Sequence, residues 1–169
     1  MSIVLISPFS NMMRNGAQNA KNYPYWQELI VKLKKFAEIN EIIQIGIGNE
    51  YRFEGVVHRF NQPLKEVEKL VRNVDVWISV DNFLPHLCNA QKVPTRGVVL
   101  FSRSDPAHFG YKHNINLLKD RKYLRPDQFI IWEQCPYVED AYVDTQTVIN
   151  AVFDIIKPKP PMMITGTTH

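Results

Sequence analysis

The sequence predicts an α/β fold in which helices flank a parallel sheet. Short apolar runs typical of buried strands lie at residues 3–6, 42–46 and 74–80. Segments whose apolar residues recur at helical spacing separate these runs along the chain. Because parallel strands need a crossover connection, usually a helix, this alternation indicates a parallel sheet.

The N-terminal part of the chain supplies the first strand, the first helix and the second strand. Residues 3–6 form an apolar run that leads into a long polar loop ending near Asn19. Over residues 25–39, apolar side chains recur at helical spacing with lysines largely between them, which predicts an amphipathic helix. The run "IIQIG" at residues 42–46 predicts the second strand, and the loop "IGNEYRF" follows it.

Two further helices and two further strands follow in the middle of the chain. Helical spacing is present around residues 64–71, and residues 74–80 form the third predicted strand. A helix begins near Phe83, and "GVVLF" at residues 97–101 predicts the fourth strand. We therefore expect a single Rossmann-like domain over residues 1–157.

The C-terminal part of the chain is less regular. "INLL" at residues 115–118 predicts a short strand, and "DQFIIWE" at residues 127–133 predicts another extended segment. The last helix is expected to begin at Asp144, a good N-cap residue, and to end before Pro158. We expect residues 158–169 to be a Pro-rich tail that is loosely ordered or docked on a partner.

Composition excludes several classes of protein. The chain has 169 residues, a net charge of +3 and 45% hydrophobic residues, as expected for one globular domain. Its Lys and Arg residues are dispersed, which favours a small anionic ligand over nucleic acid. No apolar stretch approaches the roughly 20 residues that span a bilayer, and no basic leader is present, so we expect a cytoplasmic protein. Cys88 and Cys135 lack metal-ligand spacing, and we predict free thiols, no metal and no cofactor.

Polar side chains gather where "WISVDNFLPHLCNA" changes from strand to helix. Asp81 is expected at the carboxyl end of the strand, Asn82 as the N-cap of the helix, and His86 one turn farther along the same face. The backbone N–H groups of Phe83 and Leu84 are expected to face the same loop, with the positive end of the helix dipole. Ligands of open parallel sheets bind at this edge, so we predict a phosphate site. Alternatively, these side chains only cap the helix and lie at its surface.

Two other loops end at the same predicted edge. The loop after the first strand carries Arg14 and Lys21, which could neutralise a diphosphate. The loop after the second strand carries Gly46 and Glu50, and a carboxylate there can accept both hydroxyl groups of a ribose. "GIGNE" is not a full dinucleotide-binding fingerprint, because Tyr51 stands at its last glycine, and it is also compatible with a simple tight turn.

The segment "VWISVDNFLPHLCNAQKVPTRGVVLFSRSDPAHFGY" resembles the nucleotide-sugar-binding lobe of glycosyltransferase family 9, the heptosyltransferase-like enzymes. In that family a strand is followed by Asp, then Ser or Thr, then Gly, two residues and His. Asp81, Asn82 and His86 fall on this pattern, and Asp105 and Pro106 fall on a later Asp-Pro element. The resemblance extends over residues 3–116 and implies a Rossmann-like lobe.

Two upstream matches add to the resemblance. "NAKNYPYWQELIVKL" places Lys21 on the family's Lys before a helix, and "QIGIGNE" places Glu50 on the carboxylate that meets the nucleoside. The resemblance implies that these residues bind the diphosphate, ribose and sugar of the donor. It assigns stabilisation of the leaving diphosphate to His86 and Lys21 and the sugar contact to Asp81. Asp105 is an outside candidate for the catalytic base.

The chain departs from the family in two ways. Phe83 stands where the family usually has Gly, so a bulky side chain could narrow the phosphate cradle. Family members also have an acceptor lobe that precedes this one and supplies the base, and we expect this lobe to be absent here.

Three functions follow from these expectations. The first is a glycosyltransferase that uses a nucleotide-diphosphate sugar and works with a second copy of the chain or a separate acceptor-lobe partner. The second is a non-catalytic protein that binds or sequesters a nucleotide sugar or an ADP-ribose-like ligand. The third is a nucleoside hydrolase or deoxyribosyltransferase with a carboxylate nucleophile.

Overall fold

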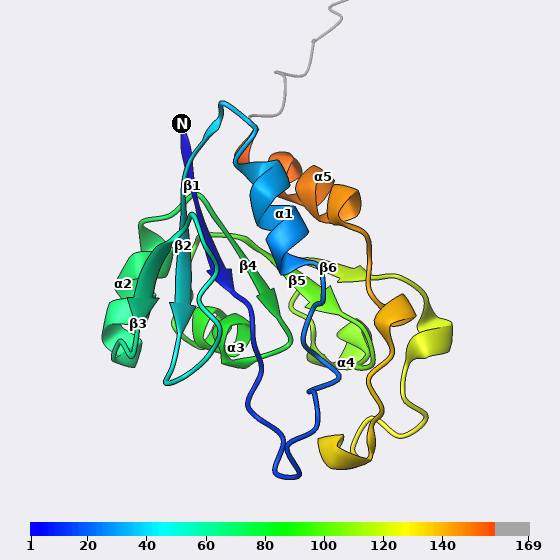
Figure 1. Cartoon of the computed structure of the whole chain (residues 1–169). Helices are drawn as coiled ribbons and strands as arrows, with labels where there is room; N and C mark the ends of the chain where they lie inside the picture. Colours follow the sequence, from blue (N-terminus) through cyan, green and yellow to red (C-terminus); the bar gives the residue numbers. More distant parts are fainter. Residues whose placement is uncertain (158–169) are drawn as a thin grey trace, which may run out of the picture.

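The computed structural model describes residues 1–157 and contains one six-stranded parallel sheet, which confirms the predicted Rossmann-like α/β fold (Figure 1). The strands are β1 (Ser2–Ser7), β2 (Ile39–Gly46), β3 (Val57–Phe60), β4 (Val76–Val80), β5 (Gly97–Phe101) and β6 (Ile115–Leu118). All neighbouring strands pair in parallel, in the order β3-β2-β1-β4-β5-β6. The strand order reverses between β1 and β4, and the loops that leave these two strands diverge there.

Helices cover both faces of the sheet. They are α1 (Trp26–Leu33), α2 (Leu64–Arg72), α3 (Phe83–Ala90), the short α4 (Pro106–Phe109) and α5 (Thr145–Ile156). Helices α1 and α5 lie side by side over one face, where they pack on Val4, Ile6 and Ile78 (Figure 1). Helices α2 and α3 cover the other face, where they pack on Leu5 and Trp77. Alternate residues of β1 thus enter opposite cores, as the two-residue period of a strand requires.

Several predicted elements differ from the structure in their bounds. The helix expected over residues 25–39 ends at Leu33, because the next turns close with shorter i to i+3 hydrogen bonds. Phe36 then packs against Phe153 at a ring-centroid distance of 4.7 Å, and the chain enters β2 at Ile39. The fourth predicted strand matches β5, and the short strand "INLL" matches β6.

The sequence analysis missed one strand, and its prediction of an extended segment at residues 127–133 was wrong. β3 lies at the edge of the sheet, where Arg59 is exposed, so no continuous apolar run marks it. Residues 127–133 do not form a strand, because the Arg125 guanidinium binds the carbonyl groups of Gln128 and Ile130. Short 3-10 helices instead connect β6 to α5, at Arg121–Tyr123, Trp132–Gln134 and Glu139–Ala141.

The last helix of the structure begins where the sequence predicted it. Asp144 caps α5, and its Oδ1 accepts a 2.7 Å hydrogen bond from the Thr147 N–H. Cys88 and Cys135 are free thiols, as expected, and both are buried. The predicted Pro-rich tail at residues 158–169 lies outside the described residues.

Candidate functional site

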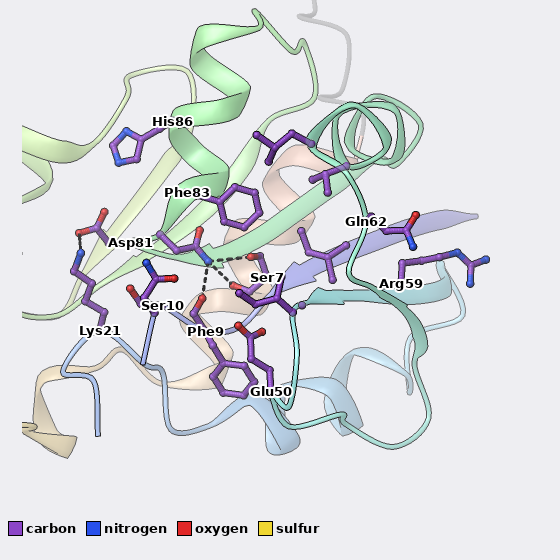
Figure 2. A pocket seen from close by; sticks show the side chains of 17 residues that line it. Ser7, Phe9, Ser10, Lys21, Glu50, Arg59, Gln62, Asp81, Phe83 and His86 are labelled. Carbon is purple, nitrogen blue, oxygen red and sulfur yellow. Dashed lines mark hydrogen bonds and ion pairs between the residues drawn. The ribbon is translucent and has the colours of Figure 1, made fainter. Parts of the chain in front are cut away.

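A cavity of about 480 Å³ opens at the carboxyl edge of the sheet, where the strand order reverses (Figure 2). The loops after β1 and β2, the beginning of α2 and the beginning of α3 form its walls. The predicted site residues that line it are Lys21, Gly46, Glu50, Asp81, Asn82, Phe83 and His86. The parallel sheet therefore brings together side chains that are up to 65 positions apart in the chain, from Lys21 to His86.

Asn82 joins the start of α3 to the end of β1. Its Oδ1 accepts the Leu84 N–H at 3.0 Å, which caps the helix. Its Nδ2 donates to the Ser7 hydroxyl at 2.9 Å and lies 3.2 Å from the carbonyl oxygens of Ser7 and Phe9 (Figure 2). The Leu84 N–H is thus not free for an anion, contrary to the sequence analysis, because the capping side chain already satisfies it.

Lys21 and Asp81 form the charged end of the cavity. The Lys21 Nζ lies 3.3 Å from the Asp81 Oδ2, and the Ser104 hydroxyl donates to the same oxygen at 2.8 Å. Asp81 is buried, whereas part of the Lys21 side chain reaches the cavity. The Lys21 backbone N–H donates to the Asn19 Oδ1 at 2.9 Å, which holds the lysine on its loop.

His86 and Glu50 lie on opposite walls of the cavity (Figure 2). The His86 Nδ1 is 2.6 Å from the Tyr111 hydroxyl, which orients the exposed imidazole. Burial raises the pKa of Glu50 above its ordinary value, although a hydrogen bond to the Ile47 backbone opposes this shift. A Cβ atom at Gly46 would lie 2.8 Å from the Glu50 Oε2 and 2.7 Å from the Phe60 ring, so a larger residue at position 46 would displace the Glu50 carboxylate or the Phe60 ring.

A second compartment of about 340 Å³ shares Lys21, Asp81 and His86 with the first. Its other wall comes from the long connection between β6 and α5 and includes Arg125 and Trp132. Arg125 is buried and lies 3.7 Å from the centroid of the Trp132 ring, while the Lys21 Nζ lies 4.5 Å from a centroid of the same side chain. The sequence analysis missed this wall, because no periodic pattern places an irregular connection against a distant loop.

Three predicted site residues, Arg14, Leu84 and Asp105, do not line either compartment. Arg14 is exposed, and its backbone N–H lies 3.4 Å from the Glu133 Oε1. Asp105 is buried and caps α4, where it accepts the Ala107 N–H at 2.9 Å. Its carboxylate also binds the Arg121 guanidinium at 3.1 and 2.8 Å. The Arg121 guanidinium, through its hydrogen bonds, holds the pKa of Asp105 below its ordinary value, so this carboxylate is a weak base.

Asp105→Asn is expected to lower the free energy of unfolding by about 1–2 kcal/mol at pH 7, because it removes the ion pair and retains a good N-cap residue. Since the folded-state pKa of Asp105 is lowered, this contribution is fully present above about pH 4 and is lost as the pH falls through that lowered value. Urea unfolding of both proteins at several pH values measures the difference. A difference that persisted at the lowest pH would contradict the electrostatic explanation.

Residues 1–157 hold neither a metal-binding cluster nor a membrane-spanning helix. Within this range, no cluster of three or more His, Cys, Asp or Glu side chains is arranged to hold a metal ion. No helix in the same range has the length and apolar character needed to cross a membrane.

Comparison with known proteins defines the fold class more closely. The structure is similar to that of E. coli ADP-heptose lps heptosyltransferase II, with a TM-score of 0.61 and 12% identity over 92% of this chain. It is also similar to the dodecameric iron-containing heptosyltransferase TibC, solved with ADP-D-β-D-heptose, with a TM-score of 0.58 and 17% identity over 90% of this chain. The chain spans 46% of the length of each of these structures.

These similarities establish a fold shared with part of the heptosyltransferases. No protein-family model matches the chain, and no curated protein matches its sequence. The shared fold agrees with the resemblance of the Asp81 to His86 segment to glycosyltransferase family 9.

Proposed function

We propose that the cavity binds a nucleotide-diphosphate sugar. The observation that carries this proposal is the convergence of Lys21, Asp81, His86 and Glu50 in one cavity of about 480 Å³, at the position where the strand order reverses. Cavities of about 300–1,000 Å³ with few polar groups are typical of small-ligand sites. The similarity to heptosyltransferase structures supports the same class of ligand.

Each polar side chain of the cavity has a role in this proposal. The Lys21 ammonium group neutralises a diphosphate oxygen, and the His86 imidazole donates a hydrogen bond to the diphosphate. The Glu50 carboxylate accepts hydrogen bonds from the ribose hydroxyl groups. Burial removes water from the Glu50 carboxylate and so raises its pKa. The ribose hydroxyl groups would replace the lost water as hydrogen-bond donors.

Transfer of the sugar would need a base near the acceptor hydroxyl. The Asp81 Oδ2 is engaged by both Lys21 and Ser104, and the Asp105 carboxylate is engaged by Arg121. We therefore propose that a transferase reaction takes its base from a second copy of the chain or from a separate acceptor-lobe partner. The same engaged carboxylates favour the second candidate, a protein that binds the nucleotide sugar without transferring the sugar.

A thermal-shift screen of ADP, UDP, GDP and their sugars tests the proposed ligand. At a concentration about 100-fold above Kd, a ligand is expected to raise the Tm by about 5–10 °C. His86→Ala is expected to reduce this shift at a fixed ligand concentration, because it removes a donor to the diphosphate. His113→Ala, an exposed histidine outside the cavity, serves as the matched control and is expected to retain the shift. No shift with any of these compounds in the wild-type protein would refute the proposal.

Analysis of the recovered ligand separates the two candidate functions. Release of a nucleoside diphosphate from the sugar, even by slow hydrolysis, supports a transferase. Stable binding with the nucleotide sugar recovered unchanged supports a binding protein.

A further inference from the structure

The side chain of Phe83 divides the cavity into two parts. In Figure 2 its ring lies between Lys21, Asp81 and His86 on one side and Gln62 and Arg59 on the other. Ile45, which pairs with Arg59, and Leu64 and Val67 on α2, which begins two residues after Gln62, also line the cavity and add apolar surface. The Lys21–Asp81 ion pair and these apolar side chains thus lie on opposite sides of one aromatic ring, and Arg59 adds a charge to the apolar side.

The Phe83 side chain is exposed and not buried in the protein core. The residue is 46% exposed, although phenylalanine is usually buried, and it lies at the first position of α3. An aromatic face that borders a cavity in this way can contact a flat ligand group. A diphosphate gains little from such a face, because its oxygens are charged and strongly hydrated.

The cavity presents one kind of group for each part of a nucleotide. Lys21 and His86 lie at the charged end, and Glu50 lies beside the middle, below the Phe83 ring in Figure 2. The diphosphate, ribose and base of such a ligand would then face Lys21 and His86, Glu50 and the Phe83 ring, respectively. The base is the flat apolar part of such a ligand.

We infer that Phe83 is a specificity-determining residue whose ring stacks on the base of the bound nucleotide. This inference rests on the proposed function and concerns the same cavity. It assigns to Phe83 the preference of the protein for diphosphates that carry a base over diphosphates that do not. The position is distinctive because a glycine there, as in the pattern that this segment resembles, has no side chain that could stack.

Isothermal titration calorimetry with ADP, UDP, GDP and inorganic pyrophosphate tests the inference. The wild-type protein is expected to bind at least one nucleoside diphosphate about tenfold or more tightly than pyrophosphate, because only the nucleotide has a base that stacks on the Phe83 ring. Phe83→Ala is expected to lose about tenfold in nucleotide affinity with unchanged pyrophosphate affinity, and Phe83→Tyr is expected to retain both. Val31→Ala, also at a 46% exposed apolar residue but on α1, is the control and should change neither.

The possible results separate the two proposals. If the wild-type protein binds no nucleoside diphosphate, the proposed function fails and this inference fails with it. If the nucleotide binds and Phe83→Ala binds it equally well, only the stacking role is wrong. Tighter binding by Phe83→Ala would mean that the ring obstructs the cavity, and it also overturns the inference.

A second variant keeps the test independent of the folding of Phe83→Ala. Phe83→Trp introduces an indole at the same place, and its fluorescence is expected to be quenched by a stacked base and not by pyrophosphate. The signal is compared with that of the wild-type protein, which contains Trp26, Trp77 and Trp132. Equal quenching in the two proteins would refute stacking at this position.

Discussion

Gly97→Ala is expected to lower the free energy of unfolding by about 3 kcal/mol, at the upper end of the range for overpacking. Gly97 and Trp77 are paired residues on the adjacent strands β5 and β4. A Cβ atom at Gly97 would lie 2.2 Å from two atoms of the Trp77 ring. The indole cannot withdraw, because Trp77 is fully buried and its Nε1 donates to the Thr95 carbonyl at 3.0 Å.

Urea unfolding of the variant and the wild-type protein measures this effect. Gly16→Ala is the matched control, because no atom lies within 4 Å of a Cβ at Gly16, whose backbone φ is +73°. It should lose only the cost of a left-handed backbone, about 1 kcal/mol. Equal losses in the two variants would show that the Trp77 ring moves aside. Trp77→Leu combined with Gly97→Ala should lose less stability than the sum of the single changes.

Lys21→Met is expected to weaken nucleoside diphosphate binding by about 30- to 150-fold, which corresponds to about 2–3 kcal/mol for a charge-assisted contact. Two effects act in the same direction. The variant removes the cation that meets the diphosphate, and among residues 1–157 it leaves the buried Asp81 carboxylate with only the Ser104 hydroxyl as a partner. That uncompensated carboxylate would repel the ligand anion.

Calorimetric titration with the nucleoside diphosphate that binds the wild-type protein most tightly measures this loss. Lys34→Met is the matched control, because Lys34 is exposed and its Nζ donates to the Gly55 carbonyl, away from the cavity. Lys21→Met combined with Asp81→Asn should recover stability, because no buried charge remains unpaired, but should not recover full affinity. Unchanged affinity in Lys21→Met would place the diphosphate elsewhere.

Local sequence patterns predicted the strands of the sheet interior well. The strand "GVVLF" matches β5 because a buried strand of a parallel sheet is apolar on both faces and forms a continuous run. The edge strand β3 was missed, because it is half exposed and carries Arg59. Its assignment depends on pairing with β2, a long-range contact that the residues themselves do not encode.

The same distinction applies to the cavity. Lys21, Glu50 and Asp81 could be placed together because the carboxyl ends of parallel strands meet at one edge. Asp105 also follows a strand, but its partner Arg121 lies on the connection between β6 and α5, and their ion pair fixes it outside the cavity. That connection has little regular structure, so no periodicity could predict the compartment that Arg125 lines.

The Asn82 side chain connects two of the elements that border the cavity. One amide group caps the first turn of α3 and also binds the backbone where β1 ends, so these two parts of the cavity floor are held together. This part of the site is therefore already ordered before a ligand binds. A ligand bound at the proposed site would lose little affinity to the ordering of this part of the floor.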